Sequence, residues 1–132
     1  MSRFLLLFAA LTTAAPLAAE PLTVRTGETW LFALRDGAPV DAKRVAATIA
    51  PAPGQFKVSL QPMMGTTMTV TNNSRFDYAY RAVLILSGGK AGASKACAVP
   101  AGGRMAIEHW PKPVTAVRLS DFKPAPAGSL CP

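Results

Sequence analysis

Few side chains in this sequence could carry out chemistry. His109 is the only histidine, so a Ser-His-Asp or Cys-His mechanism would have to use it. Alternation along residues 105–110 puts His109 on the same strand face as Met105 and Ile107, which predicts partial burial. No G-x-S-x-G elbow, phosphate-binding loop or His-Glu-x-x-His helix occurs, and the seven carboxylates are scattered. We therefore expect no catalytic residues and a protein that is not an enzyme.

Four residues could instead bind a soft metal ion. Met63, Met64 and Met68 cluster around one predicted turn, and His109 lies on a later strand. Thioether sulfur selects Cu(I), and exported bacterial copper carriers use methionine with histidine. Against this, methionine commonly fills gaps in protein cores, and the spacing matches no copper motif. A periplasmic copper-binding protein is thus the alternative to a protein without a cofactor.

The run Arg75-Phe76-Asp77-Tyr78-Ala79-Tyr80-Arg81 has the composition of an interaction site. Arginine and aromatic residues are frequent anchors of protein interfaces, and the same residue types stack on sugars. Alternation predicts that Tyr78 and Tyr80 face one way and Arg81 the other. Packing of the two tyrosines at the edge of the core is the competing interpretation.

The first 19 residues have the three parts of a signal peptide. Arg3 gives a positive start, an apolar run follows, and small residues with Pro16 precede a predicted cut after Ala19. The apolar run is shorter than the ~20 residues that span a bilayer, so we expect no transmembrane segment. The short, alanine-rich leader is typical of bacteria. We expect a periplasmic or secreted protein.

Positive charge is the main compositional signal. The chain has 14 Lys and Arg against seven Asp and Glu, and removing the leader lowers the formal charge from +7 only to +6. An exported protein rarely meets nucleic acid, so we expect an envelope protein or an anionic envelope component as partner. The candidate residues of a basic face are Arg75, Arg81, Arg104, Arg118 and Lys112.

The two cysteines predict a structural disulfide. Cys97 and Cys131 allow only one pairing within the chain, and an isolated pair in an oxidising compartment is typically a bridge. A redox pair would favour C-x-x-C spacing, which is missing. Closing this loop stabilises the fold by about 3–4 kcal/mol in the chain-entropy description.

Most of the mature chain has the two-residue period of half-buried strands. Residues 41–50 fit either a strand or a short helix, and we favour a strand bounded by Pro39 and Pro51. Residues 88–95 are predicted to form a loop, and 96–99 to form a hairpin with 105–110 around the turn at 100–103. The predicted strands are 22–24, 30–34, 56–61, 67–71, 78–86, 96–99, 105–110 and 114–122.

Seven or eight short strands at this spacing predict one antiparallel β-sandwich. Residues 68–74, followed by the long strand to 86, resemble the early core strands of bacterial immunoglobulin-like domains. That resemblance implies an immunoglobulin-like sandwich and no particular function, because this architecture carries many unrelated roles. The expected organisation is a signal peptide at 1–19, a β-sandwich at 20–123 and a disulfide-tied tail at 124–132. The function predicted from the sequence is an exported, non-catalytic binding module of the bacterial envelope.

Overall fold

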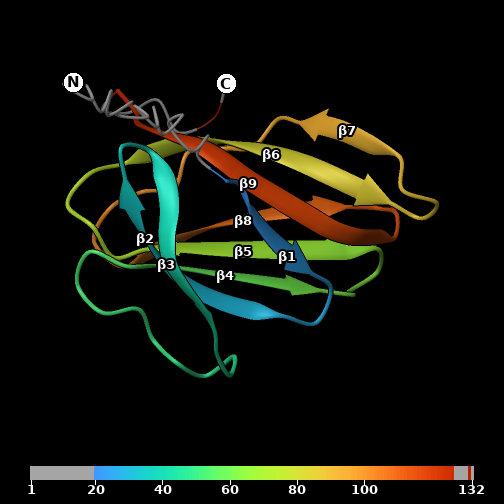
Figure 1. The fold of residues 1–132 in the computed structure, drawn as a ribbon, viewed down its shortest axis with the longest axis horizontal. Helices are drawn as coiled ribbons and strands as arrows, with labels where there is room; N and C mark the ends of the chain where they lie inside the picture. The colour runs from blue at the N-terminus through green and yellow to red at the C-terminus, as the bar shows by residue number, and fades with distance from the viewer. Residues whose placement is uncertain (1–19, 127–130, 132) are drawn as a thin grey trace, which may run out of the picture.

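The protein is an all-β sandwich of two antiparallel sheets (Figure 1). The computed structural model describes residues 20–126 and 131, so the predicted signal peptide lies outside the described residues. Within the described part, no helix is long and apolar enough to cross a membrane. The strands are β1 (Leu22–Arg25), β2 (Thr29–Arg35), β3 (Ala38–Arg44), β4 (Phe56–Gln61), β5 (Thr66–Asn72), β6 (Tyr78–Leu86), β7 (Ala91–Ser94), β8 (Arg104–Trp110) and β9 (Val114–Pro124).

The sheets have four and five strands. The four-stranded sheet has the order β1-β9-β6-β7, and the five-stranded sheet has the order β3-β2-β4-β5-β8. Strand β9, which is 11 residues long, pairs with both β1 and β6. The predicted sandwich is therefore confirmed, with nine strands rather than seven or eight.

The core lies between the sheets and follows from the two-residue period. Strands β4 and β5 alternate buried and half-buried residues along their whole length. Phe122 of the opposite sheet packs against Phe32 and Phe56, with ring centroids 5.6 and 5.7 Å apart. Tyr80 stacks on Phe122 at 5.3 Å, so one aromatic cluster joins the two sheets.

An irregularity in β9 brings the β2–β3 turn against the opposite sheet. The β6–β9 register shifts between Ala79 and Arg81, and Asp121 has φ 55°. The next residue, Phe122, donates its N–H to the Gly37 carbonyl at 3.0 Å. Gly37 has φ +78°, and a Cβ there would lie 2.6 Å from the Phe122 carbonyl oxygen. This position of the turn therefore requires glycine.

The predicted strand at 41–50 is wrong beyond its first four residues. Strand β3 is Ala38–Arg44, so it contains Pro39 instead of starting after it. Proline is tolerated because β3 is an edge strand with a neighbour on one side only. The chain then leaves the sheet, after the Val45 N–H donates to the Thr29 carbonyl at 2.9 Å. Residues 46–50 are exposed, so their alternation does not reflect burial.

Two further predictions near the C-terminus are wrong. Residues 91–94 form β7, paired with β6, where a loop was expected. Strand β8 pairs with β5 rather than with 96–99, and Val99 forms a bridge with Tyr78. Gly102 and Gly103, with φ +79° and +80°, turn the chain towards β5. The N–H of Gly103 donates to the Asn72 carbonyl at 2.8 Å, which starts the β5–β8 pairing.

The predicted disulfide is confirmed. Cys97 and Cys131 are bonded, with their Cα atoms 4.3 Å apart and a sequence separation of 34. The N–H of Cys97 also donates to Oε1 of Glu108 at 2.7 Å. The bridge thus connects the C-terminal tail to the segment that covers the inner side of β8.

Candidate functional site

Four basic side chains share the outer face of the four-stranded sheet. They are Arg25 on β1, Arg81 on β6, and Arg118 and Lys123 on β9, and all four are exposed. Their neighbours on this face are mostly small or aliphatic, for example Val83, which is paired with Arg118. Long side chains between small ones project furthest from the sheet. We call these four residues the basic face.

The side chains of the basic face form no ion pair and no hydrogen bond within residues 20–126 and 131. Arg25 nevertheless lies close to Glu28, which accepts its main-chain N–H and whose pKa is lowered in part by the charge of Arg25. In the other sheet three basic residues are engaged, whereas the side chains of Arg35 and Lys43 have no partner in the described part. Arg44 pairs with Glu28 at 3.3 Å, Arg104 lies 4.0 Å from Asp77, and Lys57 donates to a loop carbonyl.

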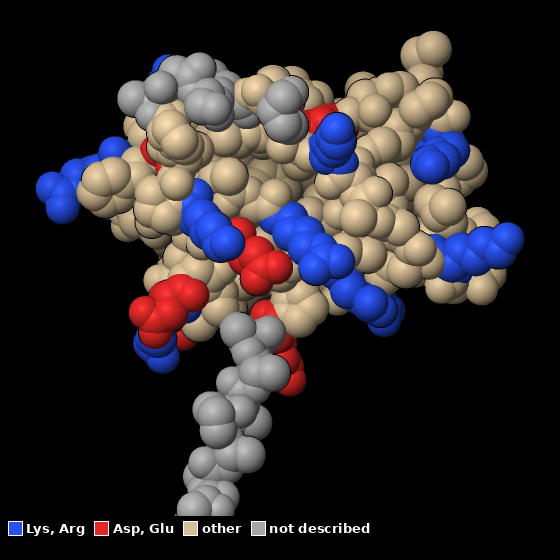
Figure 2. Space-filling view, turned by 90° about the horizontal axis from the view of Figure 1, so that it is seen from above, with Lys and Arg blue, Asp and Glu red and all other residues tan. Residues whose placement is uncertain are grey.

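Figure 2 looks down on the same side of the molecule. Lys and Arg side chains are spread across the whole width of this view, and the acidic side chains lie mostly in its left half. Among the strands of the four-stranded sheet, Asp121 is the acidic residue beside the four basic ones. An excess of basic over acidic side chains on one face creates a positive potential there, and the acidic side chains in the left half of the view reduce it locally.

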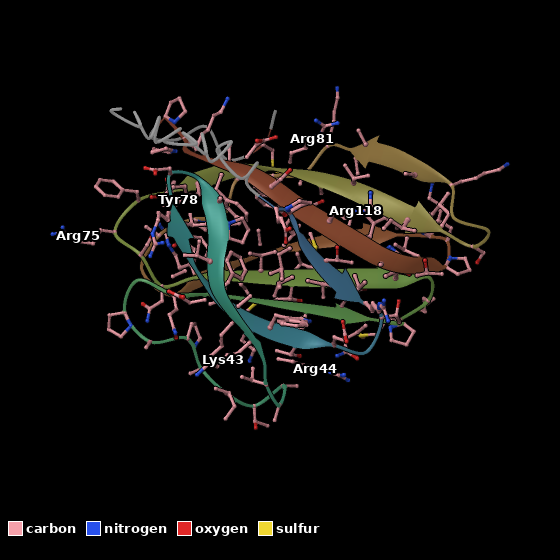
Figure 3. The ribbon with its side chains drawn as sticks, in the orientation of Figure 1. Lys43, Arg44, Arg75, Tyr78, Arg81 and Arg118 are labelled. Atoms are coloured by element: carbon pink, nitrogen blue, oxygen red, sulfur yellow. A yellow bond between two sulfur atoms is a disulfide. The ribbon has the colours of Figure 1, made fainter. Side chains whose placement is uncertain are left out.

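The structure assembles part of the basic face that the sequence predicts. Arg81 and Arg118 lie on the same outer face, whereas Arg75 is at one end of the molecule (Figure 3). Arg104 begins β8, and Lys112 lies beyond its other end. Arg25 and Lys123 complete the basic face but were not identified from the sequence. The two residues could be assigned to this face from their alternation along the strands, but only once the β1–β9 and β6–β9 registers are known.

The predicted interaction run is divided between a surface groove, the core and the basic face, to which Arg81 belongs. Arg75, Phe76 and Tyr78 line a surface groove of about 580 Å³, in which the Phe76 side chain is 58% exposed. Tyr80 packs into the core, as the competing interpretation held, and its hydroxyl has no hydrogen-bond partner in the part that the structure describes. Burial, and secondarily the carboxylate of Glu108, raise the pKa of Tyr80 well above its usual range.

The structure separates Met68 from the other three proposed copper ligands. Met68 is fully buried between the sheets, whereas Met63 and Met64 are exposed at the β4–β5 turn. His109 pairs with Thr67, which puts it on the outer face of the sheet, opposite to Met68. It does meet the turn, since its Nε2 lies 3.2 and 3.0 Å from the carbonyl oxygens of Met63 and Met64. In the tautomer with the proton on Nε2, this nitrogen donates to the two carbonyls, so the contact is with the main chain of the methionines.

The predicted burial of His109 is wrong. His109 does share a face with Met105 and Ile107, but all three side chains are exposed. Their strand, β8, lies at the edge of the five-stranded sheet, and no further layer of the described chain covers its outer face. Alternation identifies which residues share a face, but here the more apolar face is the outer one, because the inner face of β8 carries the charged residues Arg104 and Glu108.

Three carboxylates share one cleft, and Glu28 lies apart from them. Glu28 accepts the N–H of Arg25 at 2.9 Å, which is the main cause of its lowered pKa, with smaller contributions from Trp30 and from the charges of Arg44 and Arg25. Glu20, Asp36 and Asp121 line a cleft of about 340 Å³ beside β9, together with Lys123 of the basic face. Among residues 20–126 and 131, no three His, Cys, Asp or Glu side chains come close enough to hold a metal ion.

Fold and surface define a small, disulfide-closed β-sandwich with a basic sheet face. No family model, curated protein or solved structure matches the chain in comparisons with known proteins.

Proposed function

We propose that this protein is an exported, non-catalytic binding module that recognises an anionic surface of the bacterial envelope through its basic face. The observation that carries the proposal is the group of four exposed, unpaired basic side chains on one outer sheet face. The leader-like N-terminus and the disulfide support export to the periplasm or beyond. The immunoglobulin-like assignment stays a prediction and adds nothing to the function.

The arrangement of the charges favours an extended ligand over a small one. Arg25, Arg81 and Arg118 come from three different strands and lie across the sheet instead of converging on a cavity. Spread charges suit a surface with many phosphates, such as a layer of acidic lipid headgroups. Each basic side chain near such a surface contributes about 1 kcal/mol, so the four together can hold the protein there reversibly.

The test is binding to lipid vesicles that contain phosphatidylglycerol, measured by cosedimentation. The double variant Arg81→Gln/Arg118→Gln removes about 2 kcal/mol of attraction, which is roughly a 30-fold loss in partitioning. The matched control is Arg75→Gln/Lys112→Gln, which removes the same charge at the two ends of the molecule. We expect this control to lose much less, and we expect binding by the unmodified protein to weaken as salt rises.

Two results would contradict the proposal. The first is equal binding of the unmodified protein to phosphatidylglycerol and to purely zwitterionic phosphatidylcholine vesicles. The second is an equal loss for the two double variants, which would show that only net charge matters and that the basic face has no special role.

A further inference from the structure

The two sheets have four edge strands, and three of them are protected against pairing with another chain. Strands β1 and β7 have only four residues each. Strand β3 contains Pro39, ends in Lys43 and Arg44, and has an irregular register with β2. Short length, proline, lysine and bulges are the features by which natural proteins prevent contacts between sheet edges.

Strand β8 lacks most of this protection. It has seven residues and pairs with β5 in unbroken register over all of them. Its outward side chains include Met105 and Ile107, which are 56% and 61% exposed. Every second residue of an edge strand points its N–H and C=O away from the sheet. Within residues 20–126 and 131, no main-chain hydrogen bond is made on the free side of β8.

We propose that β8 pairs antiparallel with β8 of a second copy of this chain, around a two-fold axis at Ala106. This register places Met105 opposite Ile107 of the second copy, and Ile107 opposite its Met105. Both exposed apolar side chains of each copy are then covered by apolar partners on the same sheet face. The two five-stranded sheets become one continuous sheet.

Charge complementarity supports a second copy as the occupant. Alternation along β8 places Arg104, Ala106 and Glu108 on the face of the strand that is turned towards the other sheet. An inward-pointing charge on an edge strand opposes pairing with an arbitrary chain, because the charge loses water without gaining a partner. In the proposed register, Glu108 lies opposite Arg104 of the second copy, and this pair occurs twice. Both side chains also have contacts within their own copy, Glu108 with the Cys97 N–H and Arg104 with the Ala101 carbonyl and Asp77. The pairing between copies adds to these contacts, so it favours β8 over a strand that lacks the two complementary charges.

The size of the contact sets the expected affinity. Seven residues of strand extend about 23 Å, and pairing along one edge buries less than the ~1,200 Å² at the lower limit of stable interfaces. We therefore expect a weak dimer, with a dissociation constant in the micromolar range or above. The dimer does not depend on the basic face, which lies on the other sheet.

The first experiment is sedimentation equilibrium of the disulfide-bonded protein from about 1 to 500 µM. We expect the mass to rise from monomer to dimer, and Ile107→Lys to weaken association at least tenfold. The matched control is Ile49→Lys, which makes the same change at an exposed isoleucine between β3 and β4, and it should leave association within twofold. A monomer throughout the range, or equal effects of the two variants, overturns the proposal.

The second experiment tests the register with two exposed substitutions that are not expected to disturb folding. Met105→Lys and Ile107→Glu should each abolish the dimer when alone, because each places a charge opposite an apolar side chain. An equimolar mixture should restore association, because the two new charges then face each other across the axis. If the mixture stays monomeric while the unmodified protein dimerises, the register at Ala106 is wrong. If the monomer instead captures a synthetic extended peptide at β8, the occupant is not a second copy.

Discussion

Asn72 on β5 is fully buried, and Asn72→Asp replaces a donor with an acceptor while the shape stays the same. Its Nδ2 donates to the carbonyls of Phe76 and Val99 at 2.8 and 3.0 Å. Its Oδ1 accepts from the N–H and the hydroxyl of Ser74 at 2.9 and 2.6 Å. Because carbonyls only accept and an amide N–H only donates, this network determines which end of the side chain is nitrogen.

The magnitude follows from the groups that lose a partner. At pH 7 the new carboxylate leaves two carbonyls without their donor, at about 1–3 kcal/mol each, so we expect a loss of about 2–6 kcal/mol, with about 3 kcal/mol in the lower half of that range. A protonated carboxyl can donate to one of the two carbonyls and should recover about half of this. Burial and the facing carbonyls raise the pKa of the new carboxyl in the folded state. The protonated form therefore supports folding fully below the unfolded pKa of about 3.9, and the support is lost as the pH rises through the folded-state pKa.

The assay is urea unfolding of Asn72→Asp and of the unmodified protein at pH 4 and pH 7. The free energy difference between the two proteins should be about 1.5 kcal/mol smaller at pH 4. Asn72→Ala is the control, since it removes the same hydrogen bonds without introducing a titrating group and should show a pH-independent loss. A difference for Asn72→Asp that is the same at both pH values would refute the reasoning.

Three shorter predictions concern stability, each read from the thermal or urea midpoint. Replacing Cys97 and Cys131 together by serine should lower the free energy of unfolding by about 3–4 kcal/mol, unless the bridge is already reduced in the reference protein. Gly37→Ala should cost clearly more than Gly54→Ala, because both have positive φ but only the former places a Cβ against a carbonyl. Tyr80→Phe should raise the free energy of unfolding by about 1 kcal/mol, because it removes a buried hydroxyl without a hydrogen-bond partner. A lower free energy of unfolding would show that this hydroxyl does form a hydrogen bond.

The sequence predicts where the strands lie along the chain better than it predicts which strands pair with one another. Alternation correctly identifies β4, β6 and the shared direction of Tyr78 and Tyr80, because burial on one face leaves a direct pattern, but it did not tell whether that direction was inward. It fails for 46–50, where small residues alternate without packing, and for β7, whose Ala-Gly-Ala-Ser sequence has no pattern. It also misplaces β8, because the pairing of β8 with β5 depends on contacts distant in sequence.

The candidate surface was harder to predict for the same reason. Arg81 and Arg118 are adjacent only through the β6–β9 pairing, which joins residues far apart in the chain. Arg25 joins them through β1, at the other end of the sequence. The disulfide, by contrast, needed no such knowledge, because two cysteines permit one bridge. The number of cysteines alone determines which disulfide can form within the chain. Predicting which side chains share a surface requires the pairing register of every strand that carries them.

The two proposed surfaces combine in a definite way. Antiparallel pairing of two identical strands within one sheet requires a two-fold axis perpendicular to that sheet, because opposite residues share a face. In each copy the basic face is the outer face of the other sheet. Both copies then present their basic faces on the same side, and the dimer doubles the number of charges that one anionic surface can contact.

This geometry makes the effect of Ile107→Lys on vesicle binding counterintuitive. The substitution adds a positive charge, but on the outer face of the five-stranded sheet, which points away from the anionic surface, so by itself it should leave the attraction nearly unchanged or slightly stronger. It also removes the dimer and with it the doubled contact, so at protein concentrations above the dimer dissociation constant we expect at least tenfold weaker binding to phosphatidylglycerol vesicles. Below that constant both proteins are monomeric, and the variant should bind equally well or better. Cosedimentation across the two concentration ranges measures this crossover, and stronger binding by the variant at every concentration would show that the copies do not act together.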